Sequence, residues 1–567
     1  MTGLGCAVWG LGSSFRRFFT VLTGLILTLF LAMQAALAQG VADDSVKRGQ
    51  PHRGGTLRVT MASPSETLDP QITYSSAYLQ IFVSVYDGLL AYRRASSKEG
   101  LEIVPDIAEA LPTVSPDGLT WRFRIHDHIF FSNGAALTTD DVVASMRRLF
   151  RVGSPTADSF YRNIMGAEKC LQHAAQCRLE GVTGDVKSRV VTFRLRQPDP
   201  EFAQKLAFSH AVILPRDVTG RDSGASPLPG TGPYHITKYD PSTGMRLERN
   251  PFFRPWSPLA QPDGYVDHIQ IDFGLTDEAA VTAVERGQYD VMLGEKPQDR
   301  YSELGDRYAR QIHLQPLLGY YYLVLNVREP PFTSIKVRQA LNQAIDRRAV
   351  AILYGGEAVA TPLCDLIPDG MRKRPSDCAA RAHQRPDLAK ARRVIRETPF
   401  AGAAVTLVVR NNAVDTNIGL YVRDLLEKLS FKASIRTLAP ASLSSYIGNS
   451  DHHVAIALTT WYADYPSPSV FLYDLLGCEN IHPGLDISTN ASGYCEPVLE
   501  RLMKQAMTTQ DKAEAAQFWE EANVMAMRAA PLIPLIQPRY IDFTSARLGH
   551  YRYSLLNHLI LSEVWVR

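Results

Sequence analysis

The stretch Trp461-Tyr-Ala-Asp464-Tyr-Pro-Ser-Pro468 separates two apolar segments of the chain. Before it, Val454–Leu458 is short and apolar, which is typical of a buried strand. After it, the apolar run Val470–Leu476 resumes. Because the two prolines restrict the backbone between these segments, a tryptophan and a lone carboxylate are held at a rigid corner. Such a corner can place an aromatic wall and one acid at the mouth of a cleft.

Outward from this corner, strand-like and helical patterns alternate along the chain. At 567 residues the chain is also too long for a single hydrophobic core. The residues alone therefore predict a multidomain α/β protein. The clearest units are the strand Gly55–Met61, the helix Ser334–Tyr354, and a β-α-β unit formed by Val405–Val409, Ile418–Leu429 and Lys432–Ile435.

The first 38 residues are typical of a secretory signal. Arg16-Arg17 precede the apolar run Phe18–Met33, and Ala36-Leu-Ala38 supplies small residues at the cleavage positions. We expect cleavage after Ala38 and export to the periplasm. The alternative is an uncleaved anchor, because the apolar run approaches the length of a membrane span. The cleavage site carries no cysteine, which argues against a lipid anchor.

Charge excludes some partners. Residues 1–38 contain two basic residues and no acidic one, so the rest of the chain carries 58 of each sign. A net charge near zero argues against nucleic acid or an anionic membrane as the main partner.

Six cysteines remain once Cys6 is removed with the leader, and an even number suits an oxidising compartment. Pairing by proximity is one of fifteen connectivities, and small loops make it the simplest. The predicted disulfides are Cys170–Cys177, Cys364–Cys378 and Cys478–Cys495.

Zinc is the competing interpretation of these cysteines. The sequence has no CxxC or HxxxH spacing, and the adjacent His452 and His453 would point to opposite faces of a strand. We therefore expect no metal and no cofactor.

An ordered set of short motifs runs from about Gly54 to the C-terminus. Together with the Trp461-x-x-Asp464 corner, the set resembles the dipeptide/oligopeptide/nickel-binding family of solute-binding proteins of ABC importers, extracellular family 5. No single motif is decisive, but their order is specific. The motifs are Gly55-Thr-Leu, Leu68-Asp-Pro70, Tyr86-Asp-Gly-Leu-Leu90, Asn133-Gly134, Thr138-Thr-Asp-Asp-Val142, Gly230-Thr-Gly-Pro-Tyr234, Arg249-Asn-Pro251, Asn326, Pro330-Pro-Phe332 and Val337-Arg-Gln-Ala-Leu-Asn-Gln-Ala-Ile-Asp346.

The resemblance implies an α/β fold of two lobes that close on a hinge, with an additional subdomain in the N-terminal lobe. The predicted division is a signal peptide at 1–38, lobe I at 39–90, 213–316 and 531–567, the inserted subdomain at 91–212, and lobe II at 317–530.

A zwitterionic peptide needs an anion for its ammonium and a cation for its carboxylate, because unpaired buried charges are costly. The resemblance gives the ammonium to Asp464, whose alternative is a turn aspartate before Pro466. Trp461 is expected as an aromatic wall, or as a core residue. Arg410 ends a strand where binders of short ligands place an arginine that grips the carboxylate, and its alternative is a solvated strand end.

Three further side chains are candidates for the cleft. Tyr322 and Asn326 would lie on a strand entering the second lobe, where a strand edge can pair with a peptide backbone. The alternative is that the tyrosine belongs to the hinge core. Tyr74 follows Leu68-Asp-Pro70 and could close the pocket from the first lobe, or could lie in the core or on the surface.

The ligand class stays open. Binders of longer peptides often carry a basic residue a few positions before the aspartate, and Ala455–Thr460 has none. We expect a monomeric, non-enzymatic protein that delivers a short peptide or peptide-like solute to an inner-membrane ABC permease. A nickel chelate, an opine or a short oligosaccharide is the alternative within the family. A secreted hydrolase is less expected, because the chain has no Gly-x-Ser-x-Gly and no His-Glu-x-x-His.

Overall fold

The computed structural model describes residues 52–96, 98–294, 296–297, 300–371 and 385–567. The chain forms two units, residues 1–53 and Gly54–Arg567, and the sheets lie in the second. The predicted signal peptide lies outside the described residues. Within them, no helix is both long enough and apolar enough to cross a membrane.

The first sheet has five strands in the order β11-β1-β10-β9-β8. The second strand in this order, β1, is parallel to both of its neighbours, with Val59 opposite Ile271 and Val291. One face buries an apolar cluster that includes Tyr78, Ile81 and others from helix α2 (Ser76–Phe82). The strands are β1 (Thr56–Met61), β8 (Tyr234–Asp240), β9 (Gly244–Arg249), β10 (His268–Phe273) and β11 (Val291–Leu293).

The second sheet has the order β12-β18-β13-β17-β15-β16, and β14 also pairs with β18. The predicted β-α-β unit is confirmed as β15 (Ala404–Arg410), α13 (Ala413–Lys428) and β16 (Lys432–Leu438). Helix α13 begins earlier than the apolar pattern does, because the Asn412 side chain accepts a hydrogen bond from the Asp415 amide at 2.8 Å. The other strands are β12 (Ile312–Pro316), β13 (Gly319–Leu325), β14 (Ala360–Pro362), β17 (Ile456–Tyr462) and β18 (Leu532–Phe543).

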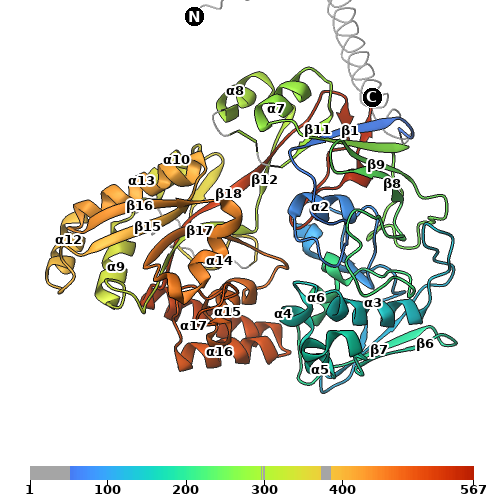
Figure 1. Ribbon diagram of the computed structural model, residues 1–567, viewed down its shortest axis with the longest axis horizontal. Helices are drawn as coiled ribbons and strands as arrows, with labels where there is room; N and C mark the ends of the chain where they lie inside the picture. The colour runs from blue at the N-terminus through green and yellow to red at the C-terminus, as the bar shows by residue number, and fades with distance from the viewer. Residues whose placement is uncertain (1–51, 97, 295, 298–299, 372–384) are drawn as a thin grey trace, which may run out of the picture. The chain divides into compact units, whose positions relative to one another are not determined.

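Strand β18 connects the two sheets. Its first half pairs with β13, its second half pairs with β12, and the next residue, Thr544, bridges Val291 of the first sheet. Figure 1 shows β12 and β18 running together between the two groups of elements. The predicted domain boundary at 531 falls at the start of this shared strand and stays a prediction.

A third sheet, with the order β4-β5-β7-β6, packs against helix α3 (Thr139–Arg151). A reciprocal pair of hydrogen bonds between Thr138 and Asp141 starts this helix. The strands are β4 (Thr113–Val114), β5 (Thr120–Arg124), β6 (Val182–Asp185) and β7 (Val190–Arg194).

The single helix predicted over Ser334–Tyr354 is wrong. The structure has two helices, α9 (Ile335–Ala344) and α10 (Arg347–Tyr354). Ile345 is extended, and the Asp346 side chain accepts hydrogen bonds from two amides at the start of α10. The apolar spacing continues across the break because both helices bury one face in the same core.

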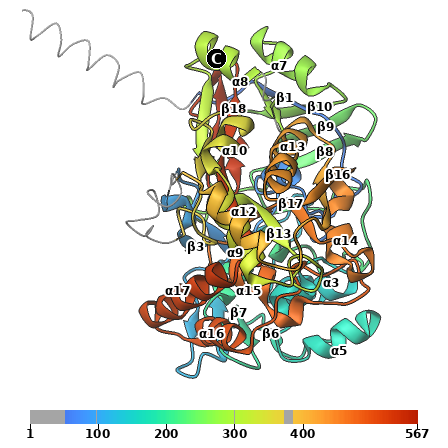
Figure 2. The ribbon, with the colours of Figure 1, turned by 90° about the vertical axis from the view of Figure 1, so that its left-hand side faces the viewer.

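The remaining elements cover these sheets. In Figures 1 and 2, the long helices α16 and α17 lie side by side. The other helices are α4 (Ala157–Tyr161), α5 (Ala167–Gln172), α6 (Phe202–Leu206), α7 (Asp277–Glu285), α8 (Tyr301–Arg307), α12 (Leu388–Arg396), α14 (Leu443–Gly448), α15 (Ser469–Leu476), α16 (Pro497–Thr508) and α17 (Lys512–Ala529). Short paired strands are β2 (Leu90–Tyr92), β3 (Ile103–Pro105), β19 (Leu548–Gly549), β20 (Tyr553–Ser554), β21 (His558–Leu559) and β22 (Trp565–Val566).

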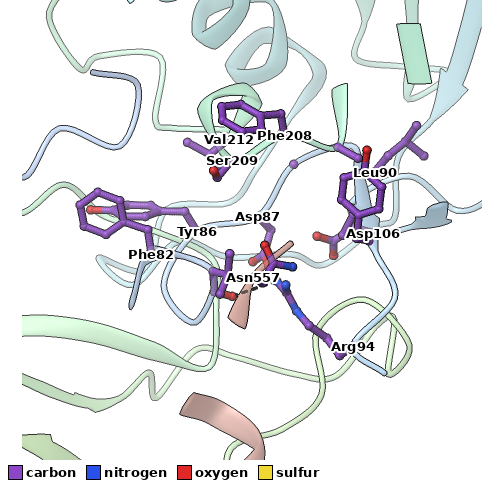
Figure 3. A pocket seen from close by; sticks show the side chains of 15 residues that line it. Phe82, Tyr86, Asp87, Leu90, Arg94, Asp106, Phe208, Ser209, Val212 and Asn557 are labelled. Atoms are coloured by element: carbon purple, nitrogen blue, oxygen red, sulfur yellow. Dashed lines mark hydrogen bonds between the residues drawn. The ribbon is translucent and has the colours of Figure 1, made fainter. Parts of the chain in front are cut away.

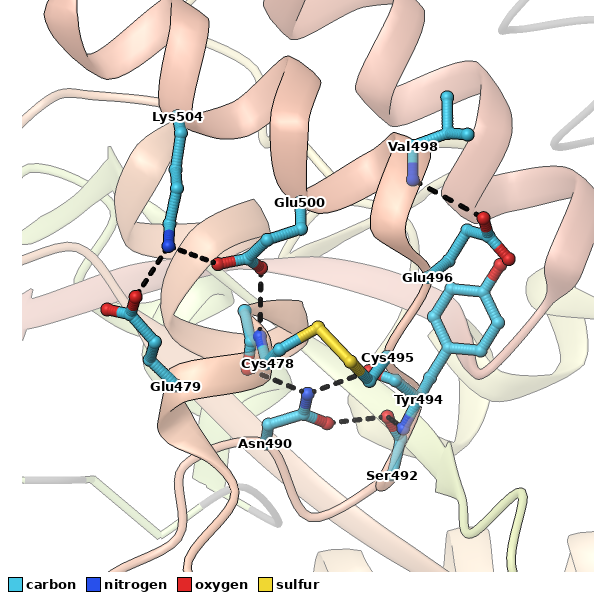
Figure 4. Close-up of a disulfide and its surroundings, with 11 residues drawn as sticks. Cys478, Glu479, Asn490, Ser492, Tyr494, Cys495, Glu496, Val498, Glu500 and Lys504 are labelled. Atoms are coloured by element: carbon cyan, nitrogen blue, oxygen red, sulfur yellow. Dashed lines mark hydrogen bonds and ion pairs between the residues drawn. A yellow bond between two sulfur atoms is a disulfide. The ribbon is translucent and has the colours of Figure 1, made fainter.

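Two of the predicted disulfides are confirmed, Cys170–Cys177 and Cys478–Cys495. Figure 4 shows how the second one closes its loop, with Glu500 accepting a hydrogen bond from the Cys478 amide at 2.9 Å. The predicted pairing of Cys364 with Cys378 falls outside the described residues.

Candidate functional site

The corner that follows strand β17 is fixed by the second sheet. Trp461 is still part of β17 and lies opposite Tyr320 of β13. The Ala463 amide then donates a hydrogen bond to the Leu318 carbonyl at 2.7 Å, and the chain turns through residues 464–468 into α15. The sheet therefore positions the residues that precede Asp464.

Trp461 is partly buried and ties the strand to the following helix. Its indole Nε1 donates a hydrogen bond to the Val470 carbonyl at 2.7 Å, and its ring packs against the core. This contact fixes the ring orientation and leaves part of the side chain exposed.

The structure brings Asp464 and Tyr74 together, although 390 positions separate them in the chain. The Tyr74 hydroxyl donates a hydrogen bond to the Asp464 carboxylate. The tyrosine is 50% exposed, and its ring lies 5.3 Å from the ring of His210. Burial raises the pKa of Asp464 to about 6, while the hydrogen bond from Tyr74 acts in the opposite direction.

Other acids gather around this pair. Burial raises the pKa of Asp474 well above its usual value, and the nearby carboxylates of Asp464 and Glu201 raise it further. Lys205, which forms a buried ion pair with Asp199 at 2.7 Å, lowers it. No motif in the sequence marks Glu201 or Asp474 as a neighbour of Asp464. Glu201 precedes α6, far away in the chain, and Asp474 lies within the apolar helix α15.

Arg410 is occupied by an internal ion pair. Its guanidinium contacts the carboxylate of Asp415, which is buried, through Nε and through Nη2 at 3.3 Å. Nη1 donates a hydrogen bond to Thr460 Oγ1 at 3.1 Å, and the charged group lies 5.5 Å from the centre of the Tyr321 ring. With 19% of its side chain exposed, Arg410 is not a solvated strand end.

Tyr322 and Asn326 lie inside the fold. Tyr322 is buried on β13, with its ring 5.4 Å from that of Tyr320. The buried Asn326 donates a side-chain hydrogen bond to the Val454 carbonyl at 3.1 Å, and its amide donates to the Ala455 carbonyl at 2.9 Å. This placement matches the alternative in which the tyrosine is part of the core.

A small cavity of about 30 Å³ lies elsewhere, and Figure 3 shows Asp87, Arg94, Asp106 and Asn557 on its wall. Asp87 accepts hydrogen bonds from Thr231 and Gln261, and burial raises the pKa of both aspartates. A volume of this size holds about one water molecule, so the cavity has no room for a solute.

The family described as "Bacterial extracellular solute-binding proteins, family 5 Middle" matches residues 102–483, which is most of the chain. The chain belongs to this solute-binding family.

The curated relatives of this family-5 protein are distant but span most of its length. The probable ABC transporter periplasmic-binding protein SapA of Escherichia coli is 24% identical, over 81% of this chain and 82% of the relative. The dipeptide-binding protein of Pseudomonas aeruginosa is also 24% identical, over 89% and 93% of the two chains.

Solved structures share the fold. The clavulanic acid biosynthesis oligopeptide binding protein 2 aligns with a TM-score of 0.81 at 22% identity, covering 91% of this chain and 96% of its own. The Helicobacter pylori binding protein DppA, in complex with the peptide STSA, aligns with a TM-score of 0.73 at 19% identity, covering 92% and 99%. The predicted α/β two-lobe fold of the family is therefore confirmed.

Proposed function

We propose that this family-5 protein is the periplasmic solute-binding component of an ABC importer. It captures a short peptide or peptide-like solute between its two lobes and delivers it to a permease in the inner membrane. It acts as a monomer, without catalysis, after removal of residues 1–38. The relatives, among them a periplasmic-binding protein of an ABC transporter and a dipeptide-binding protein, support this function.

The observation that carries the proposal is the partly buried Asp464 with Tyr74 beside it. A raised pKa of about 6 means that the protein pays to keep this carboxylate ionised at neutral pH. An ammonium group would offset that cost, and a carboxylate has room for further donors beside the Tyr74 hydroxyl. We therefore assign the free amino group of the solute to Asp464, with Trp461 as the adjacent wall.

Arg410 does not take the solute carboxylate in this proposal. Its contacts with Asp415 and Thr460 already engage all three nitrogens of the guanidinium, and removing it from them would leave the buried Asp415 unpaired. Arg410 instead holds the start of α13 against the sheet, next to the corner.

Titration calorimetry tests the assignment. Purified protein, freed of bound solute by unfolding and refolding, is titrated with matched dipeptides and tripeptides whose amino group is either free or acetylated. Binding of the free forms, with large losses on acetylation, is expected. Equal affinities for both forms would overturn the role of Asp464, and chromatographic detection of cleaved peptide would overturn the non-catalytic assignment.

A further inference from the structure

Glu201, at the start of α6, accepts three hydrogen bonds from a single segment of the second half of the chain. Ser469 Oγ donates at 2.8 Å, the Tyr465 hydroxyl at 3.2 Å, and Ser467 Oγ also donates to the same carboxylate. Only 7% of the Glu201 residue is exposed. An ionised carboxylate can only accept, so three hydroxyl donors suit it.

The segment that Glu201 holds is the corner that carries Asp464. Tyr465 follows Asp464 directly, and its ring also packs at 5.4 Å against Phe160 of α4. Three side chains from the first half of the chain therefore contact one short segment of the second half. They are Tyr74, Phe160 and Glu201.

This contact lies away from the place where the chain passes between the sheets. Figure 1 shows the connection through β12 and β18 in the upper half of the view, and α4, α6 and α15 in the lower half. The strands β12 and β18 would then act as the hinge, and the polar contact of Glu201 lies away from it. This arrangement allows two lobes to open and close.

We infer that Glu201 is a positioning residue. Its hydrogen bonds stabilise the closed arrangement of the two lobes and fix the position of the corner that carries Asp464. When the lobes separate, its carboxylate exchanges three hydroxyl donors for water, so the contact is reversible. When they close, the desolvation of the charge is offset by these donors and by the nearby Lys205, whose own partner is Asp199. The solute site is therefore complete only when the Glu201 contact forms.

Because this role rests on the proposed capture between two lobes, its test uses the protein without solute. Fluorophores are attached through non-natural amino acids at the exposed Val186 and Val524, one on each side of the contact. Single-molecule energy transfer then reports the ratio of closed to open molecules. We expect a closed population in the solute-free wild type, reduced about tenfold in Glu201→Ala and less in Glu201→Gln, which keeps one acceptor.

Two further variants make the result specific. Ser467→Ala combined with Ser469→Ala removes two donors from the other side and should reduce the closed population as Glu201→Ala does. Glu168→Gln, an exposed acid on α5, should leave it unchanged. Thermal unfolding confirms that each variant is folded.

The inference is overturned if the solute-free wild type has no closed population, or if Glu201→Ala closes as often as the wild type. It survives if peptides do not bind in the separate calorimetric titration, because closure is measured without them; that outcome would reject the proposed solute instead.

Discussion

Replacing Asp464 with asparagine deletes the charge at the corner and changes little else. The amide oxygen of asparagine can still accept the hydrogen bond from Tyr74, and the size of the side chain is kept. The variant therefore isolates the attraction between the carboxylate and a solute ammonium.

The magnitude follows from the burial of the site. Removing one partner of a buried charge pair costs about 2–5 kcal/mol. Asp464 is only partly buried and keeps a neutral donor, which places the loss near the lower bound, about 2 kcal/mol or roughly thirtyfold in affinity. The melting temperature of the solute-free protein should stay the same or rise, because burial disfavours the ionised form of Asp464 above its raised pKa.

Calorimetry of the wild type and Asp464→Asn, with one peptide in free and acetylated forms, measures this loss. The thirtyfold difference should disappear for the acetylated peptide, which has no ammonium. Asp306→Asn, which changes an exposed acid on α8, serves as the matched control. If Asp464→Asn binds the free peptide as tightly as the wild type does, the ammonium assignment is refuted and a neutral ligand such as a sugar becomes the better hypothesis.

Three other predictions concern pH, an ion pair and a disulfide. The affinity for an amino-bearing peptide should fall as the pH drops through about 6. Asp464 takes up a proton there, whereas a bound ammonium favours the ionised form. A calorimetric affinity that stays constant between pH 5 and 7.5 would contradict this. Arg410→Gln should destabilise the fold by about 3 kcal/mol in urea unfolding, since Asp415 is left buried and unpaired, while peptide affinity stays unchanged; an intact fold with weakened binding would restore Arg410 to the solute site. Serine at both Cys478 and Cys495 opens a loop with a sequence separation of 17 and should cost about 3 kcal/mol, seen as a lower melting temperature than that of the oxidised wild type; an unchanged melting temperature would contradict this.

Local patterns predicted the architecture well. The ordered motifs indicated the family. Alternating apolar residues located the strand β1, and short apolar runs located β15 and β17, because burial in a sheet leaves such patterns in the sequence. The helix over Ser334–Tyr354 failed because the apolar spacing continues across Asp346, whose side chain starts a new helix. A capping aspartate in the middle of an apolar pattern was the signal that could have revealed the break.

The site was only partly predictable. The corner indicated Asp464 and Trp461, since a lone acid after a buried strand stands out. The contacts of Asp464 with Tyr74 and of its neighbours with Glu201 join segments far apart in the chain, so no local pattern predicts them. Arg410 is a different case, because its partner Asp415 is only five residues away. The pairing depends on where α13 begins, and Asn412 starts that helix so that the Asp415 carboxylate contacts the end of the strand.

The most direct test of the central claim is native mass spectrometry of the protein purified from the periplasm, followed by identification of the small molecule that it releases. We predict a bound solute with a free amino group and at least one peptide-like amide, lost from the Asp464→Asn variant under the same conditions. A released sugar or metal chelate without an amino group, retained equally by wild type and variant, would contradict the account.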